Sequence, residues 1–366
     1  MGDPDPATTL GVEEEFHLVD PIRRVLAPVA REVVAFAGRL GAELDPEFQR
    51  TSIETATAVC RSLGEVRQQL VARRRAAAAA AAQAGAALLA SGTVPMNGGP
   101  GHPVYPDDRY VWMAHEFGQV ASEHQICSCQ VQVGVGDPEL AVGVLNRVRR
   151  WLPVLLAITA SSPFWDGADT SFASYRTMLW SRWPTAGPTG SFASREQYRE
   201  VVAALQRTGT ARDAGMMYFD VRLSHRYPTV EIRVADACPR VDDAVLLAGL
   251  ARALVTTAAR ETIALGPGDD ARVELLRSAT WRAARSGLGG ELVDPLAWTA
   301  RPAREVLQTL LTHLTPALED AGDHALVDDL LADIVRDGTS AQRQRAVFAR
   351  GSADDVVDSL LAETAG

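Results

Sequence analysis

One stretch of the sequence, Met216–Arg240 (MMYFDVRLSHRYPTVEIRVADACPR), constrains the fold most. It predicts two strands joined by a short turn at His225–Pro228, because polar and apolar residues alternate on both sides of that turn. Alternation places each set on its own face of a β-sheet. One face is therefore apolar, and the other carries four charged residues: Asp220, Arg222, Glu231 and Arg233. Such a cluster predicts a site for an anion and a metal ion, although ion-pair ladders on exposed sheet faces are a common alternative.

A second predicted strand, near residue 10, carries carboxylates on one face. In the segment GVEEEFHLVDP, Glu13, Glu15 and His17 lie on one face, the apolar residues lie on the other, and Pro21 ends the strand. Two carboxylates that stand side by side repel each other unless a cation lies between them, and Mg²⁺ is the usual cation at such oxygen sites. The alternative is an edge strand that charge protects against aggregation.

Two further segments have the same two-faced pattern. Residues 48–58 place Ser52 and Glu54 on one side, and residues 126–136 place Ser128, Gln130 and Gln132 on one face. Between the strands, helical periodicity predicts helices over residues 27–40, 61–89, 137–161, 194–207 and 241–263, followed by helical hairpins towards residue 366. The sequence therefore predicts an α+β fold with a curved, mainly antiparallel sheet, helices on its apolar face and an open concave site on its polar face.

The chain shows no internal repeat and no composition break that would divide it. We expect residues 1–9 to be disordered and residues 10–366 to form a single catalytic domain with a helical C-terminal part. The Gly- and Pro-rich loop 91–108 is expected to border the site. The run Arg73–Arg75 lies in an Ala-rich helix, and we interpret it as a solvated face.

Composition excludes several classes of function. A formal net charge of −10 over 366 residues argues against a nucleic-acid-binding surface, which would show basic clustering. No signal peptide and no apolar segment long enough to span a bilayer is apparent, so we predict a cytoplasmic protein without a membrane partner. The four cysteines are expected to be buried free thiols, with a zinc site as the less favoured alternative.

Two segments supply candidate ligand-binding residues outside the strands. The aromatic stretch SSPFWDGADTSFASYRTMLWSRWPTAGP predicts a substrate pocket in which Arg176 is a cation for an anionic substrate. The aromatic residues expected in its wall are Trp165, Phe172, Tyr175, Trp180 and Trp183. The alternative is a loop whose aromatic side chains fill the core. In WRAARSGLGG, Arg282 and Arg285 could reach a phosphate group.

Five motifs together carry a resemblance to a known family. GVEEEF, QVQVGV, SSPFW with ASYRTMLW, DVRLSHRYPTVEIRVAD and WRAARSGL occur in this order between about residues 10 and 294. In this respect the chain resembles the glutamate–cysteine ligase type 2 family, the short bacterial carboxylate–amine ligases of the glutamine-synthetase-like superfamily. The resemblance implies an antiparallel sheet that binds ATP and a divalent metal, Mg²⁺ or Mn²⁺, with a small-molecule carboxylate and an amine as substrates.

The resemblance also implies roles for individual residues. Glu13, Glu15, Glu54 and Glu231 match the metal-binding carboxylates, Arg233 would hold phosphate in the transition state, and Arg176 with its aromatic neighbours would lie near the amino-acid substrate. To these we add, from residue type and position, Gln130 as a metal ligand, Glu15 as a catalytic residue beside Arg233, Gln132 with Arg282 and Arg285 as nucleotide-binding residues, and Arg222 as a substrate-binding residue.

The chain departs from the family pattern at three histidines and leaves alternatives open. It has QVQVG where relatives have HVHVG, and GTVP where they have GTHP; SHR also replaces SPR. The favoured hypothesis is an ATP-dependent ligase that forms an amide through an acyl phosphate, such as γ-glutamyl transfer to an amino acid or amine. One alternative is a non-catalytic ATP- or metabolite-binding paralogue. Another is a metal-dependent amide hydrolase with His17, His115 or His124 as its base. The physiological amine and a homo-oligomeric state stay open.

Overall fold

The computed structural model describes residues 9–99, 101–268 and 270–366. Within these ranges the main sheet contains β1 (Leu10–Val19), β2 (Asp45–Pro46), β3 (Ser52–Ala56), β4 (Ala87–Leu89), β5 (Cys129–Gly134), β8 (Val221–Leu223) and β9 (Thr229–Ile232). The strand order is β2-β3-β1-β5-β9-β8, with β4 also paired to β1, and every pairing is antiparallel. The predicted antiparallel sheet is therefore confirmed, including the hairpin around Ser224–Pro228.

The register of the sheet brings the predicted polar residues onto one face. Glu15 on β1 lies opposite Glu54 on β3, and Glu13 lies opposite Gln130 on β5. Across the next two pairings, Gln132 lies opposite Glu231, which in turn lies opposite Arg222. The alternating apolar residues point the other way into one core, which includes Val12, Val131, Val133, Val230 and Ile232.

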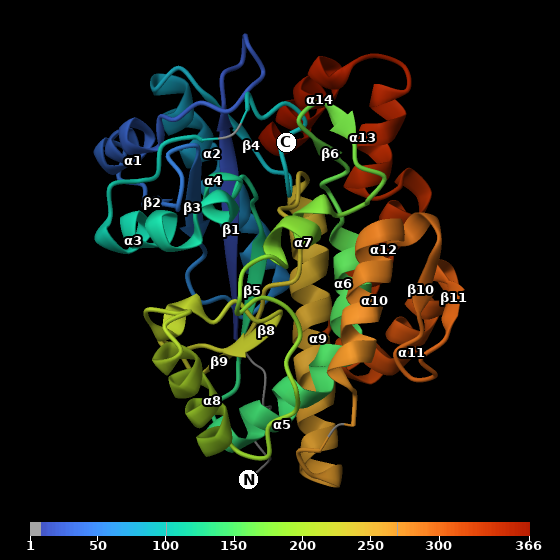
Figure 1. The fold of residues 1–366 in the computed structure, drawn as a ribbon. Helices are drawn as coiled ribbons and strands as arrows, with labels where there is room; N and C mark the ends of the chain where they lie inside the picture. The colour runs from blue at the N-terminus through green and yellow to red at the C-terminus, as the bar shows by residue number, and fades with distance from the viewer. Residues whose placement is uncertain (1–8, 100, 269) are drawn as a thin grey trace.

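Helices cover the apolar face, as Figure 1 shows. Helices α5 (Pro138–Val148) and α9 (Val241–Leu265) contact the strands, and α6 (Leu152–Thr159) lies beside α9. Outside them, α10 (Val273–Ser286) packs against α6 and α11 (Ala303–Ala321) packs against α9. Helix α5 begins where Pro138 occupies its first turn and Asp137 Oδ1 accepts a hydrogen bond from Glu139 N at 2.9 Å. Helix α9 is buried along most of its length, because it packs against the sheet on one side and against α11 on the other.

At the other end of the apolar face lie α1 (Ala30–Arg39) and α2 (Leu63–Gln83). The predicted helix over residues 61–89 is too long: Gly85 has a φ of +75°, which ends the helix, and Ala87–Leu89 forms β4. High helix propensity in the alanine run concealed this boundary. The solvated-face interpretation of Arg73–Arg75 is also wrong for Arg74, whose side chain is only 4% exposed.

The remaining elements surround this framework. They are α3 (Asp108–Phe117), α4 (Gln119–Ser122), α7 (Tyr175–Trp180), α8 (Arg195–Arg207), α12 (His324–Asp337), α13 (Ser340–Phe348), α14 (Ala353–Ala365) and the small sheets β6–β7 (Phe164–Trp165, Ala168–Asp169) and β10–β11 (Glu291–Val293, Ala300–Pro302). The C-terminal part is helical, and α14 packs against β4.

The N-terminus, the helices and the cysteines test three further expectations. The predicted disorder of residues 1–9 falls outside the described residues except at Thr9, whose carbonyl oxygen accepts a hydrogen bond from Gly134 N at 3.0 Å. None of the described helices is long and apolar enough to cross a lipid bilayer. All four cysteines are free and buried, as predicted.

Candidate active site

A cavity of about 1220 Å³ opens over the polar face of the sheet. Nine of the predicted site residues line it: Glu13, Glu15, Glu54, Gln130, Gln132, Arg176, Arg222, Glu231 and Arg233. Trp180 and Trp183, which the sequence analysis expected in the pocket wall, also line the cavity, as does the candidate base His124. Side chains that sequence reasoning did not select complete the wall, among them Glu47, Tyr110 and Tyr218. The concave site predicted for this face is therefore present.

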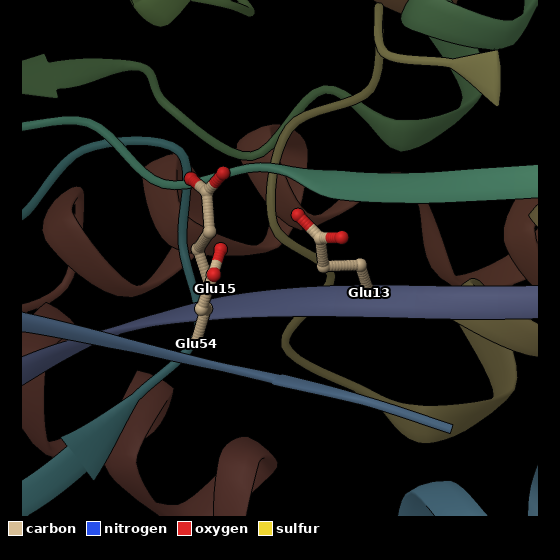
Figure 2. A group of neighbouring side chains, drawn as sticks. All are labelled: Glu13, Glu15 and Glu54. Atoms are coloured by element: carbon tan, nitrogen blue, oxygen red, sulfur yellow. The ribbon is translucent and has the colours of Figure 1, made fainter. Parts of the chain in front are cut away.

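Three carboxylates meet on the floor of the cavity. Glu13, Glu15 and Glu54 each offer an oxygen atom within 4.8 Å of the others. Figure 2 shows their side chains rising from two neighbouring strands to the same side of the sheet. Because like charges directly across a strand pair repel, Glu15 and Glu54 need a neutralising partner. Hard oxygen donors at this separation fit a divalent cation such as Mg²⁺ or Mn²⁺.

Glu47 joins this group, and the sequence analysis did not select it. Burial and then the charge of Glu15 raise the pKa of Glu47 to about 7. Glu47 also shares a hydrogen bond with Glu54, whose pKa burial and the charge of Glu47 raise well above its ordinary value. Glu47 follows the two-residue strand β2, which is too short to show alternation. Its only sequence signal is its position just before the predicted strand at residues 48–58.

The central hairpin supplies the positive charge of the site. Arg222 donates from Nε and Nη2 to the two carboxylate oxygens of Glu231, both at 3.0 Å. Arg233 Nη1 also donates to Glu231 and to the Gln130 side-chain oxygen. Burial opposes ionisation of Glu231, but the Arg233 and Arg222 guanidiniums outweigh it and hold the Glu231 pKa below its ordinary value. Glu231 is therefore ionised and anchors Arg233 beside the carboxylates.

Gln130 connects the two halves of the site. Its amide nitrogen donates to Glu15 Oε1 at 2.9 Å, while its amide oxygen accepts from Arg233. Ser128 adds two donors to Glu15, from its backbone N and its hydroxyl, both at 2.7 Å. Glu15 is thus held in one orientation. An amide can donate and accept at the same time at any pH, so this bridge needs no particular protonation state.

One end of the cavity is aromatic. Trp180 and Tyr218 lie 4.8 Å apart between ring centroids, and Trp183 donates from Nε1 to His124 Nδ1 at 3.0 Å. Burial, followed by the charge of Arg176, lowers the pKa of His124 to about 3, so this imidazole is neutral. Arg176 lies 5.7 Å from the Trp180 ring centroid and 3.8 Å from Asp236, and its side chain is 4% exposed.

None of the three candidate histidines, His17, His115 and His124, is placed to act as the general base of a hydrolase. Burial lowers the pKa of His17 to about 3, and neither His17 nor His115 lines the cavity. His124 lines it, but its accepting nitrogen is already occupied by Trp183. The geometry therefore favours positioning and charge neutralisation over histidine-assisted attack by water.

The structure does not bring every selected residue to the cavity. Trp165 and Tyr175 lie 5.9 Å apart between ring centroids and contact each other, and Arg285 donates to the backbone oxygen of Ser171. Arg282 and Arg285 lie on α10, which packs on α6 behind the sheet. The residues selected by sequence that do not line the cavity are Trp165, Phe172, Tyr175, Asp220, Arg282 and Arg285. The described residues of loop 91–108 do not line it either.

Known proteins resemble this chain along nearly its whole length. The family model for glutamate-cysteine ligase family 2 matches residues 9–359. A protein of Frankia alni provisionally named glutamate–cysteine ligase 2-2 is 49% identical, and the match covers 97% of each chain. A Salinispora arenicola protein provisionally named glutamate–cysteine ligase 2 is 48% identical over 99% of this chain and 96% of its own. The fold resembles that of the glutamate–cysteine ligase of Francisella tularensis in complex with AMP, with a TM-score of 0.70, 12% identity and coverage of 98% and 89%.

Proposed function

The chain belongs to glutamate-cysteine ligase family 2 and is an ATP-dependent carboxylate–amine ligase of that type, and we propose that its cavity joins the two substrates with the help of bound divalent cations. The carboxylate substrate would attack the γ-phosphorus of ATP to give an acyl phosphate and ADP. The amine nitrogen would then attack the acyl carbon, displacing phosphate and losing a proton as the amide forms. Such chemistry depends mainly on positioning and on neutralisation of charge.

The convergence of Glu13, Glu15 and Glu54 is the observation that carries this proposal. Their oxygens, with Glu47 beside them, form a set of hard donors. The ionised carboxylates repel one another without a cation, and burial together with this repulsion raises the pKa values of Glu13, Glu47 and Glu54. These carboxylates and Glu231 would hold Mg²⁺ or Mn²⁺. The bound cations would neutralise charge on the phosphate oxygens.

Arg233 is the residue that would contact the transferring phosphoryl group. Its guanidinium lies on the cavity floor between Glu231 and Gln130, and both hold it in place. A guanidinium fixed before the reaction stabilises developing negative charge without reorganising. We therefore assign Arg233 to the phosphoryl group and Gln130 to holding Arg233 and Glu15 in register.

The two ends of the cavity differ, and this difference orients the substrates. The floor at one end lacks bulky side chains at Gly11 and Gly134, and the exposed side chains of Val59 and Tyr227 also line the cavity. This end suits an adenine ring and ribose, with Gln132 close by. The aromatic end, with Arg176 and Trp180, suits the carboxylate and amine substrates.

A comparison of two variants with the native protein tests the function. Native protein is expected to release ADP when Mg²⁺, ATP, glutamate and a suitable amine are all present, with a product mass equal to the amide. Arg233→Ala and Glu13→Gln should each reduce the rate by about 10²–10³. ADP release that is unchanged in both variants, or that is independent of any amine, would contradict the assignment. An amine panel read by mass spectrometry would identify the acceptor.

A further inference from the structure

The middle carboxylate of the GVEEEF segment has a different environment from its neighbours. Glu13 and Glu15 line the cavity, whereas Glu14 points to the opposite face of β1 and is 1% exposed. Beneath the sheet it meets Arg74 of α2, whose side chain is 4% exposed. A buried charge pair is unfavourable unless the hydrogen bonds of both partners are satisfied.

Arg74 makes four hydrogen bonds to three residues. Nε and Nη2 donate to the two oxygens of Glu14, at 3.1 and 2.5 Å. Nη1 donates to the backbone oxygen of Pro239 at 2.5 Å, and Nη2 also donates to the backbone oxygen of Cys238 at 2.7 Å. The fixed fork of a guanidinium holds all four acceptors in one geometry, which a point charge such as lysine cannot do.

These contacts connect two parts of the sheet that are not neighbours. Glu14 belongs to β1, whereas Cys238 and Pro239 follow β9, and β5 lies between β1 and β9. Arg74 therefore links the two flanking segments beneath the middle strand. One backbone hydrogen bond between β5 and the segment after β9 is long here, since Cys129 N lies 3.4 Å from Ala235 O. The hydrogen bonds of Arg74 supplement this weak backbone contact.

The linked segments carry the two halves of the site. β1 presents Glu13 and Glu15. Glu231 lies in β9 and Arg233 directly follows it, five to eight positions before the Arg74 acceptors. On the basis of the proposed function, we propose that Glu14 and Arg74 are positioning residues. They set the separation between the metal-binding carboxylates of β1 and the Glu231–Arg233 pair, without touching substrate or metal. Groups that hydrogen-bond directly to metal ligands affect metal affinity by about 10–100-fold, and we expect a loss in this range when the link through the backbone is removed.

A double variant separates positioning from simple stabilisation. Apolar residues of similar size often replace a buried ion pair without loss of stability, whereas removal of one partner leaves an uncompensated charge. We expect Glu14→Leu/Arg74→Met to melt within about 3 °C of the native protein. Its affinity for Mn²⁺, measured by electron paramagnetic resonance without turnover, should fall by about 10–100-fold, together with kcat for ADP release.

A second buried ion pair provides the matched control. Arg252 on α9 and Asp323 at the start of α12 are 7% and 9% exposed, pair with each other and do not line the cavity. Arg252→Met/Asp323→Leu should leave Mn²⁺ affinity unchanged. Equal losses of Mn²⁺ affinity in both double variants would overturn the proposal, because a general loss of rigidity would then explain them.

The single variant Arg74→Lys keeps the test decisive if the double variant does not fold. It retains the positive charge and loses the fork, so weaker Mn²⁺ binding in a folded Arg74→Lys protein supports positioning. Native Mn²⁺ affinity in the folded Arg74 variants would overturn it while the proposed function stands. Absence of Mn²⁺ binding in the native protein would overturn both.

Discussion

Replacement of Glu47 by glutamine is expected to stabilise the metal-free protein, because ionised Glu47 is unfavourable in its buried position. The pKa of Glu47 rises from 4.5 to about 7, first through burial and then through the charge of Glu15. A shift of this size corresponds to about 3 kcal/mol of stability lost at pH 8. Glutamine keeps the oxygen that accepts from Phe48 N and removes the titration.

The stability gained by Glu47→Gln depends on pH, because folding raises the pKa of Glu47. An acid whose pKa is raised on folding binds more protons in the folded state between pH 4.5 and about 7. Its favourable contribution is present below pH 4.5 and is lost as the pH rises through about 7. Glu47→Gln should therefore gain little at pH 5 and the full difference at pH 8. For a chain of this length, about 3 kcal/mol corresponds to about 4 °C in the melting temperature.

Thermal unfolding in EDTA at pH 5 and pH 8 measures this effect. Glu116→Gln is the control, because Glu116 is exposed on α3 and should change the melting temperature by less than about 1 °C. With saturating Mg²⁺ and ATP the advantage of Glu47→Gln should disappear, since the native carboxylates then have a cation partner. A variant that melts below the native protein in EDTA at pH 8, or that gains as much at pH 5, would refute the argument.

Three further outcomes follow from particular contacts. Gln130→Ala breaks the bridge between Glu15 and Arg233, so kcat for ADP release should fall about 10–100-fold. Arg285 lies outside the cavity, so Arg285→Ala should leave KM for ATP unchanged. Gly92→Ala would place its Cβ 2.6 Å from the Asp236 side chain, so denaturant unfolding should show a loss of about 1–3 kcal/mol. Apparent Mg²⁺ affinity in the ADP-release assay should weaken as the pH falls from 8 to 6, because protons then compete for Glu47.

Strand alternation predicted the parts of the site that depend on a single strand. Glu13 and Glu15 share a face within one strand, and so do Arg222, Glu231 and Arg233 across one hairpin. Period two follows from the geometry of the backbone, so the sequence alone assigns these faces. Helical periodicity over residues 241–263 likewise predicted α9, whose apolar residues belong to the core beneath the sheet.

Contacts between distant segments lay beyond that reasoning. Glu47 lies next to a two-residue strand, and Tyr110 and His124 reach the cavity only because α3 and the segment after α4 pack beside the sheet. Arg74 lies in an alanine-rich helix, where uniform small residues hide which side is buried. Arg282 was selected by charge alone, which carries no information about which side of the sheet its helix occupies.

The strand order has a consequence for the synthesis of this protein. Glu13, Glu15 and Glu54 are all synthesised within the first 54 residues, but Glu231 follows Glu54 by 177 positions. At typical elongation rates this interval is roughly 10–35 s. During that time the emerging chain holds adjacent acidic groups before the ribosome has supplied Arg233. Free Mg²⁺ in the cell would neutralise these carboxylates until translation reaches the arginine.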